Sequence, residues 1–183
     1  NETKLTINKK DSTLTIETND IHVGESANVV VNVDADASGS IRLNINGGVY
    51  TVDIVDGKAA FNVSGLSAGE YSVVAVYEGD ANYNNNSATS RFTVNKLNST
   101  VNIKVSDSYV GDVANVVVNV NSDASGSISL NVNNVAYSAD IVDGEAVFNV
   151  SGLSAGDYSV VAVYAGDMKY LGNSATSRFT VNK

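Results

Sequence analysis

Two aspartate-containing loops are the segments of this chain whose residue types and spacing could bind a metal ion. Residues 34–39 read Asp-Ala-Asp-Ala-Ser-Gly, the opening of a calcium-binding loop, and residues 121–126 read Asn-Ser-Asp-Ala-Ser-Gly. Calcium takes about six to eight oxygen ligands, yet the acid usually supplied at the twelfth loop position is Ile45 here. A polar turn between strands is therefore the simpler interpretation, and a calcium site is the alternative. Its candidate ligands are Asp34, Asp36, Asp123, Asp80 and Asp167.

Residues that commonly catalyse reactions are sparse in this chain. The single histidine, His22, has Tyr109 at the equivalent position 87 residues later, so no catalytic triad recurs. The absence of cysteine excludes disulfides, thiolate nucleophiles and zinc–thiolate sites. Asp53 and Asp56 lie at a predicted hairpin, where turn formation accounts for them. We expect no enzymatic activity, and no cofactor apart from the calcium alternative.

Covalent modification has two kinds of candidate. An intramolecular lysine–asparagine bond would need a lysine that recurs in both halves of the chain, and only Lys9, Lys96 and Lys183 recur, at strand ends where a solvated lysine is the simpler interpretation. Sequons for N-linked glycosylation arise easily in a chain rich in asparagine and serine, so they are weak candidates. They begin at Asn62, Asn149, Asn85 and Asn98, the first two at matched positions.

The last long loop of each half holds the candidates for binding a ligand. Eight of the nine tyrosines fall in matched pairs, which favours an architectural role over a sugar-stacking surface. The loops 78–86 and 165–173 differ most between the halves, and ligand sites are often carried on such loops. Sequence drift in exposed loops explains the difference as well. The candidate ligand-binding residues are Asp80, Tyr83, Asp167 and Tyr170.

A repeated unit must position all of these residues. Residues 10–96 and 97–183 align without a gap, and about 59 of the 87 pairs are identical. A gap-free repeat of this size predicts two copies of one folding unit. Residues 1–9 end in Leu-Thr-Ile-Asn-Lys, which matches the end of each repeat. We expect residues 1–9 to be the last strand of a preceding copy, or an N-terminal extension.

Hydrophobic and polar residues alternate along most of each repeat, the pattern of strands buried on one face. Ile41, Leu43 and Ile45, for example, alternate with Arg42 and Asn44. This pattern predicts an all-β fold of two tandem immunoglobulin-like, seven-stranded antiparallel β-sandwiches. The strands of the first repeat are expected at residues 12–18, 27–33, 40–46, 49–55, 58–63, 70–77 and 87–94.

One tyrosine in each repeat is expected to form the tyrosine corner of such a sandwich. Tyr71 and Tyr158 each follow Leu-Ser-Ala-Gly-acid and begin a strongly β-prone run. A corner tyrosine occupies this place, and its hydroxyl donates a hydrogen bond to upstream backbone. Simple packing of the ring is the alternative.

Charge and composition limit the kinds of partner that this chain is expected to bind. The formal net charge is −9 and both repeats are acidic, so a nucleic-acid-binding role is excluded because it needs a basic surface. No stretch approaches the roughly 20 apolar residues of a membrane span, so we expect no membrane contact by this segment. Acidic surfaces repel one another, and we expect a monomer. No glycine- or serine-rich linker separates the repeats.

An ordered set of motifs recurs in both repeats. In the first repeat the set is Val23-Gly24, Gly39-Ser40, Asp56-Gly57, Leu66-Ser67-Ala68-Gly69-x-Tyr71, Ala75-Val76-Tyr77-x-Gly79-Asp80-x-x-Tyr83 and Phe92-Thr93-Val94. This set resembles the bacterial-type Ig-like repeat of the group 3 kind, which fills long surface proteins, including adhesin-like proteins of methanogenic archaea. The resemblance covers nearly the whole chain and implies an extracellular, cell-surface module without catalytic residues.

The expected function is that of a stalk segment in a long cell-surface adhesin, which projects a distal binding domain. Its partners would then be the neighbouring Ig-like repeats of the same chain. One alternative is an adhesive module that binds a cell-surface glycan or protein through loops 78–86 and 165–173. A second alternative is a rod whose stiffness depends on calcium.

Overall fold

The computed structural model describes residues 2–183 and divides the chain into two compact units, residues 1–95 and 96–183. Strands are the only regular elements among the described residues. Accordingly, no helix in this part of the chain is long and apolar enough to cross a membrane. The all-β fold predicted from the alternating pattern is confirmed.

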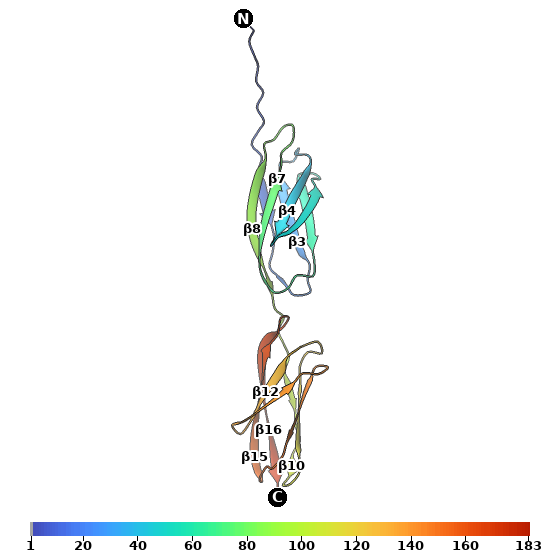
Figure 1. Cartoon of the computed structure of the whole chain (residues 1–183), viewed down its shortest axis with the longest axis vertical. Coiled ribbons are helices and arrows are strands. Elements are labelled where there is room, and N and C mark those ends of the chain that lie inside the picture. The colour runs from blue at the N-terminus through green and yellow to red at the C-terminus, as the bar shows by residue number, and fades with distance from the viewer. Residues whose placement is uncertain (1) are drawn as a thin grey trace. The chain divides into compact units, whose positions relative to one another are not determined.

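The first unit is a sandwich of two β-sheets (Figure 1). A three-stranded sheet has the order β1-β3-β6, and a five-stranded sheet has the order β2-β8-β7-β4-β5. The strands are β1 (Leu14–Glu17), β2 (Ile21–His22), β3 (Ala27–Val33), β4 (Ser40–Ile45), β5 (Gly48–Asp53), β6 (Lys58–Val63), β7 (Gly69–Tyr77) and β8 (Asn86–Asn95).

The second unit repeats this topology. Its sheets have the orders β14-β11-β9 and β10-β16-β15-β12-β13. The strands are β9 (Asn102–Lys104), β10 (Ser108–Tyr109), β11 (Ala114–Asn119), β12 (Ser127–Val132), β13 (Val135–Asp140), β14 (Glu145–Val150), β15 (Gly156–Gly166) and β16 (Leu171–Asn182).

Each unit has one strand more than expected, because a short second strand forms after the first and joins the other sheet. The segment predicted as a strand over residues 12–18 forms β1, which pairs with β3, and the chain then crosses to form β2, which pairs in parallel with β8. The carboxylate of Asp20, at the crossing, accepts a hydrogen bond from the Thr93 amide at 2.7 Å. Asp107 and Thr180 repeat this contact at 2.7 Å. The alternating pattern did not predict β2, which has only two residues and lies after the expected strand.

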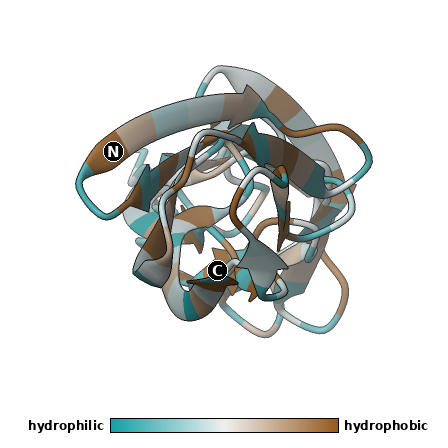
Figure 2. Cartoon of the chain, turned by 90° about the horizontal axis from the view of Figure 1, so that it is seen from below, coloured by the Kyte–Doolittle hydropathy of each residue, from teal (hydrophilic) through white to brown (hydrophobic). Residues whose placement is uncertain are grey.

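The core of each unit lies between its sheets and follows the alternation of the sequence. In β3 and β4 of the first unit, Val29, Val31, Ile41 and Leu43 have no exposed surface, and the residues between them, Val30 and Arg42, face outward. Bands of hydrophobic and hydrophilic residues alternate along the strands in Figure 2. Full burial of such a side chain contributes about 1.5–3 kcal/mol. Burial therefore stabilises each unit without a disulfide.

The ends of the units are set by hydrogen bonds. Asn95 closes β8 in the first unit, and Lys96 belongs to the second, one residue earlier than the repeat alignment places it. Residues 2–9 belong to no strand of the described chain, and the side chains of Leu5 and Ile7 are 85% and 87% exposed. Their assignment to a preceding copy stays a prediction.

Candidate functional site

Glycine starts the loop that carries most of the candidate residues. Gly79 lies between β7 and β8 at a φ of +85°, and a Cβ there would lie 2.6 Å from the carbonyl oxygen of Tyr83. Gly166 repeats this geometry, with a φ of +88° and 2.6 Å to the carbonyl oxygen of Tyr170. No other residue type fits both the left-handed backbone and the close approach. The loop therefore folds back tightly in both repeats.

The carboxylate of Asp80, the residue after this glycine, connects the loop to the segment between β3 and β4. One carboxylate oxygen of Asp80 accepts the amide hydrogens of Asn82 and Tyr83, at 2.7 and 2.8 Å. The other accepts the amide and the hydroxyl of Ser38, at 2.9 and 3.2 Å. A carboxylate has about four acceptor sites, and protein donors occupy all of them here.

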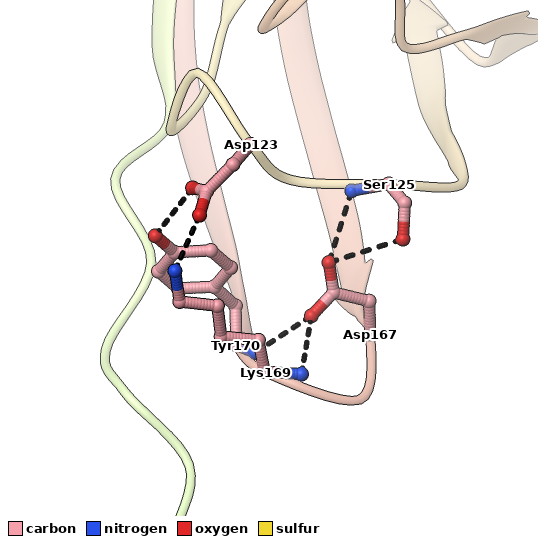
Figure 3. Close-up of polar contacts among 5 residues, drawn as sticks. All are labelled: Asp123, Ser125, Asp167, Lys169 and Tyr170. Atoms are coloured by element: carbon pink, nitrogen blue, oxygen red, sulfur yellow. Dashed lines mark hydrogen bonds and ion pairs between the residues drawn. The ribbon is translucent and has the colours of Figure 1, made fainter. Parts of the chain in front are cut away.

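Asp167 makes the same set of contacts in the second repeat (Figure 3). Its carboxylate accepts the amides of Lys169 and Tyr170 at 2.8 and 2.7 Å. It also accepts the amide and hydroxyl of Ser125, at 2.9 and 3.2 Å. The arrangement is thus a property of the repeat and does not depend on the loop residues that differ.

These hydrogen bonds hold both aspartates in the ionised form. The Ser38 amide is the main cause that lowers the pKa of Asp80 well below its usual range, and the Asn82 and Tyr83 amides add to it. For Asp167 partial burial acts in the opposite direction, but the amides of Ser125, Tyr170 and Lys169 together outweigh it and lower the pKa. Both carboxylates are negatively charged at neutral pH.

The tyrosine of the loop reaches the other aspartate-containing loop. The Tyr83 hydroxyl donates to Asp36 at 2.5 Å, and the Tyr170 hydroxyl donates to Asp123 at 2.7 Å. The bond to Asp36, with burial, raises the pKa of Tyr83 to about 12. The bond to Asp123 likewise raises the pKa of Tyr170. The two loops of each repeat are therefore joined by neutral tyrosines.

The second repeat adds a cation that the first lacks. The ammonium of Lys169 contacts the carboxylate of Asp123 and lies 5.4 Å from the centre of the Tyr170 ring (Figure 3). The equivalent position in the first repeat is Asn82. The ion pair lowers the pKa of Asp123 and raises that of Lys169. This pair was not anticipated from the sequence, since Lys169 has no lysine counterpart.

The chain entering each repeat runs along this loop. In the first repeat the Lys10 amide donates to the Asn82 carbonyl and the Asn84 amide donates to the Lys10 carbonyl, both at 2.8 Å. In the second repeat Leu97 makes the corresponding bonds to Lys169 and Leu171, at 2.9 and 2.8 Å. The loops proposed to bind a ligand thus hold the first residues of their own repeat.

Lys96 also contacts the loop of the second repeat. Its ammonium donates to the main-chain carbonyl of Asp167 at 2.5 Å. The partner of this lysine is a main-chain oxygen. It is not the side-chain carboxamide of an asparagine, which a lysine–asparagine bond would require. The ammonium of Lys96 is therefore engaged in a hydrogen bond within the second unit.

The five candidate calcium ligands do not converge on one point. The carboxylate of Asp34 accepts from the amide and hydroxyl of Thr13, at 2.8 and 3.1 Å. Asp36 and Asp80 accept from tyrosine, serine and amide donors. Over residues 2–183 no three acidic or histidine side chains are grouped as a metal site. The carboxylates bind N–H and O–H donors, whose hydrogens occupy the positions that a cation would need.

The two tyrosines expected at the corner lie where the upstream backbone is within reach. The Tyr71 hydroxyl donates to the Ser67 carbonyl at 2.9 Å, and the Tyr158 hydroxyl donates to the Ser154 carbonyl at 3.0 Å. Each ring also stacks on a buried phenylalanine, with 5.3 Å between the centroids of Tyr71 and Phe92. The contact spans four residues in each repeat, so it pins the turn before β7 and β15.

The four asparagines of the sequons are exposed, as glycosylation would require. Asn149 differs from its counterpart Asn62, because its side-chain oxygen accepts a hydrogen bond from Asn115 at 2.8 Å.

The particular contact that Tyr77 makes was not predicted from the sequence. The Tyr77 hydroxyl donates to the Ser38 carbonyl at 3.1 Å, and burial raises the pKa of Tyr77 to about 12. The matched pair of Tyr77 and Tyr164 was the available signal.

Several known protein structures are similar to this chain. The fibronectin(III)-like modules of Clostridium thermocellum CbhA are 13% identical, with 93% of this chain and 94% of theirs covered and a TM-score of 0.39. A tandem of titin Ig domains is 13% identical, with 96% and 99% covered and a TM-score of 0.39. A membrane-anchored protein of Corynebacterium diphtheriae, described as putative, is 12% identical, with 95% and 59% covered and a TM-score of 0.38.

The sequence itself identifies the unit. No curated protein has a significantly similar sequence. Residues 14–95, which run from β1 to the end of β8, match the model of the bacterial Ig-like domain (group 3). The second repeat has the same sheet order and shares about 59 of 87 residues with the first. The first repeat therefore matches the bacterial Ig-like domain of group 3, and the second repeat shares its sheet order and most of its residues.

Proposed function

We propose that this chain is a non-catalytic spacer in a longer protein at the cell surface, where it separates a distal binding domain from the cell. Domains of this family are often extracellular or surface-associated. The loops that hold the candidate residues bind the entering chain and one another, which suits an architectural role. The contacts that support this proposal therefore stabilise the fold of the repeat itself.

The observation that carries this proposal is the length of the connection. The carbonyl of Asn95 accepts a hydrogen bond from Val23 at 2.9 Å, within the first unit. The amide of Leu97 donates to Lys169 at 2.9 Å, within the second unit. Only Lys96 separates these two anchored residues. A flexible glycine- and serine-rich linker would leave many backbone torsions free, whereas this connection leaves few.

The charge of the repeats also supports a spacer. The repeats carry formal charges of −6 and −4, summed over residues 10–96 and 97–183. Like charges along a tandem array repel one another and oppose its collapse. A spacer needs this resistance to collapse, whereas an adhesive module needs a surface for its ligand.

The proposal is tested by solution X-ray scattering on the chain and on a variant with four Gly-Ser residues inserted between Asn95 and Lys96. We expect a narrow distribution of interatomic distances for the natural chain and a broader one for the variant, because the insertion adds free torsions. Circular dichroism controls for folding of both proteins. Equal, broad distributions for the two proteins would contradict the spacer.

One observation favours the alternative function, which is adhesion through the loops. Met168 at the tip of the second loop is 79% exposed, and no hydrogen bond of the loop depends on its side chain. Saturable binding to a glycan panel, lost when residues 78–86 replace residues 165–173, would favour adhesion over a spacer. Binding that neither protein shows would leave the spacer as the better account.

A further inference from the structure

An open cavity of about 700 Å³ lies where the second unit crosses from one sheet to the other. It is lined by the end of β9, by the crossing segment with β10, and by the first part of β11. Because β10 pairs with the last residues of β16, the cavity and loop 165–173 lie at opposite ends of this unit (Figure 1). Cavities of about 300–1,000 Å³ are typical of small-molecule sites.

A core residue of the first unit is replaced at this cavity. Ile21 packs in the core of the first unit and is 9% exposed. Its counterpart Ser108 lines the cavity and is absent from the hydrophobic core of the second unit. The exchange therefore removes the apolar side chain that fills this place in the first unit, and it supplies a hydroxyl instead.

Differences between the repeats are concentrated around this cavity. Of the eleven positions that line it, the seven at 104–106, 108, 109, 112 and 113 differ from those of the first repeat. Over the whole repeat, about 59 of 87 positions are identical. The lining is therefore a property of the second repeat, whereas the sheets around it are common to both.

The cavity offers polar groups that the fold leaves available. One oxygen of Asp107 accepts the Thr180 amide at 2.7 Å, and one oxygen of Asp112 accepts the Tyr109 amide at 3.2 Å. Within residues 2–183 the second oxygen of each carboxylate has no donor, and the ammonium of Lys104 has no acceptor. The carboxylate of Asp167, by contrast, is filled by donors of its own repeat.

An aromatic ring and aliphatic side chains complete the lining. Tyr109 is 62% exposed and Val113 is 56% exposed, where the first repeat carries the polar residues His22 and Ser26. Tyrosine presents a broad apolar face together with a hydroxyl. A cavity of this size that combines apolar and aromatic groups with a few polar ones has the composition of a ligand site.

We propose that this cavity binds a neutral saccharide. A sugar ring has an apolar face of C–H groups, which packs on the ring of Tyr109, and hydroxyls that both donate and accept hydrogen bonds. The open oxygens of Asp107 and Asp112 accept from these hydroxyls, and the ammonium of Lys104 donates to them. An anionic sugar is disfavoured, because the two carboxylates outnumber the ammonium and the chain carries a net charge of −9.

This site goes beyond the proposed role as a spacer and does not depend on it. It also differs from adhesion through loop 165–173, since it lies at the other end of the unit. The first repeat, with Ile21 in place of Ser108, is expected to lack it.

Titration of the full chain with four neutral disaccharides, followed by the NMR shifts of its amides, tests the proposal. The probes are cellobiose, maltose, lactose and mannobiose. We expect saturable shifts at residues 104–117 with at least one of them. Ser108→Ile restores the residue that the first repeat carries, so this variant is expected to fold. It should raise the Kd at least about tenfold, and Tyr109→Ala should raise it about two- to tenfold.

Two controls accompany this titration. Val142→Ala changes a residue that is 67% exposed and lies outside the cavity, so the Kd should stay the same. Digalacturonate, an anionic disaccharide, should bind more weakly than the neutral probe. The proposal would be overturned by the absence of saturable shifts with all four sugars, by shifts confined to loop 165–173, or by a Kd that Ser108→Ile leaves unchanged. Tighter binding of digalacturonate would overturn the preference for a neutral ligand.

Discussion

At the scale of single residues, the sequence Gly-Asp-x-x-Tyr in each repeat acts as one hydrogen-bonded unit. Gly79 allows the sharp turn, Asp80 accepts the amides of the turn, and Tyr83 extends from it to Asp36. The same residues would be candidates for binding a ligand in a sequence read without its structure. Their polar atoms are engaged within the repeat, so they stabilise the fold.

Replacing this glycine should be costly. Gly79→Ala places a Cβ 2.6 Å from the Tyr83 carbonyl oxygen and imposes a φ of +85° on an alanine. We expect a loss of about 1–3 kcal/mol in the free energy of unfolding, the usual cost of a strained backbone position. Thermal and urea denaturation measure it. Gly65→Ala, also at positive φ but with no atom near the new Cβ, separates the strain from the clash.

The aspartates predict sensitivity to acid. The pKa values of Asp80 and Asp167 are lowered in the folded chain, so the unfolded chain takes up protons at a higher pH. The stability that they contribute is complete above the unfolded pKa of about 3.9 and is lost as the pH falls below it. Melting temperatures recorded toward low pH should fall more steeply for the natural chain than for Asp80→Asn, Asp167→Asn. Parallel curves would contradict this role.

The tyrosines predict a loss of stability in base. The pKa of Tyr77, of Tyr83 and of Tyr164 is raised to about 12 in the folded chain. An unfolded tyrosine ionises near pH 10, so the stability is complete below about pH 10 and is lost as the pH rises toward the folded value. Absorbance of tyrosinate at 295 nm, followed with circular dichroism, should show ionisation and unfolding together. Ionisation of all tyrosines in a folded chain would contradict the burial of these hydroxyls.

At the scale of elements, the turn before β7 depends on a tyrosine hydroxyl. Tyr71→Phe keeps the ring on Phe92 and removes the bond to Ser67. We expect a loss of about 0.5–1.5 kcal/mol, the net value of one hydrogen bond. Chemical denaturation measures it, and Tyr158→Phe should give the same result in the second repeat. Two neutral substitutions would show that packing of the ring alone fixes the turn.

The strands themselves were largely predictable, because their hydrophobic alternation reflects burial on one face. Ile41, Leu43 and Ile45 lie in β4 and are buried as their spacing indicated. The crossing of the chain from β1 to β2 in the other sheet was not predictable. Asp20 accepts a hydrogen bond from Thr93, 73 residues away, and no local pattern encodes such a partner.

At the scale of the whole molecule, the sequence by itself determined that the chain contains two copies of one unit, and the first copy matches a known domain family. A duplication with about 59 identical pairs in 87 positions fixes two equal folds, because nearly every core position is preserved. The absence of cysteine likewise excludes disulfides without any structure. These conclusions depend on composition and spacing, which do not change on folding.

Only the tertiary structure decided what the polar residues do. Asp34 and Asp36 look alike in sequence, yet their partners differ. Asp34 accepts a hydrogen bond from the Thr13 amide, and Asp36 accepts one from the Tyr83 hydroxyl. Contacts of this kind join residues distant in the chain, and the order of the sequence does not contain them.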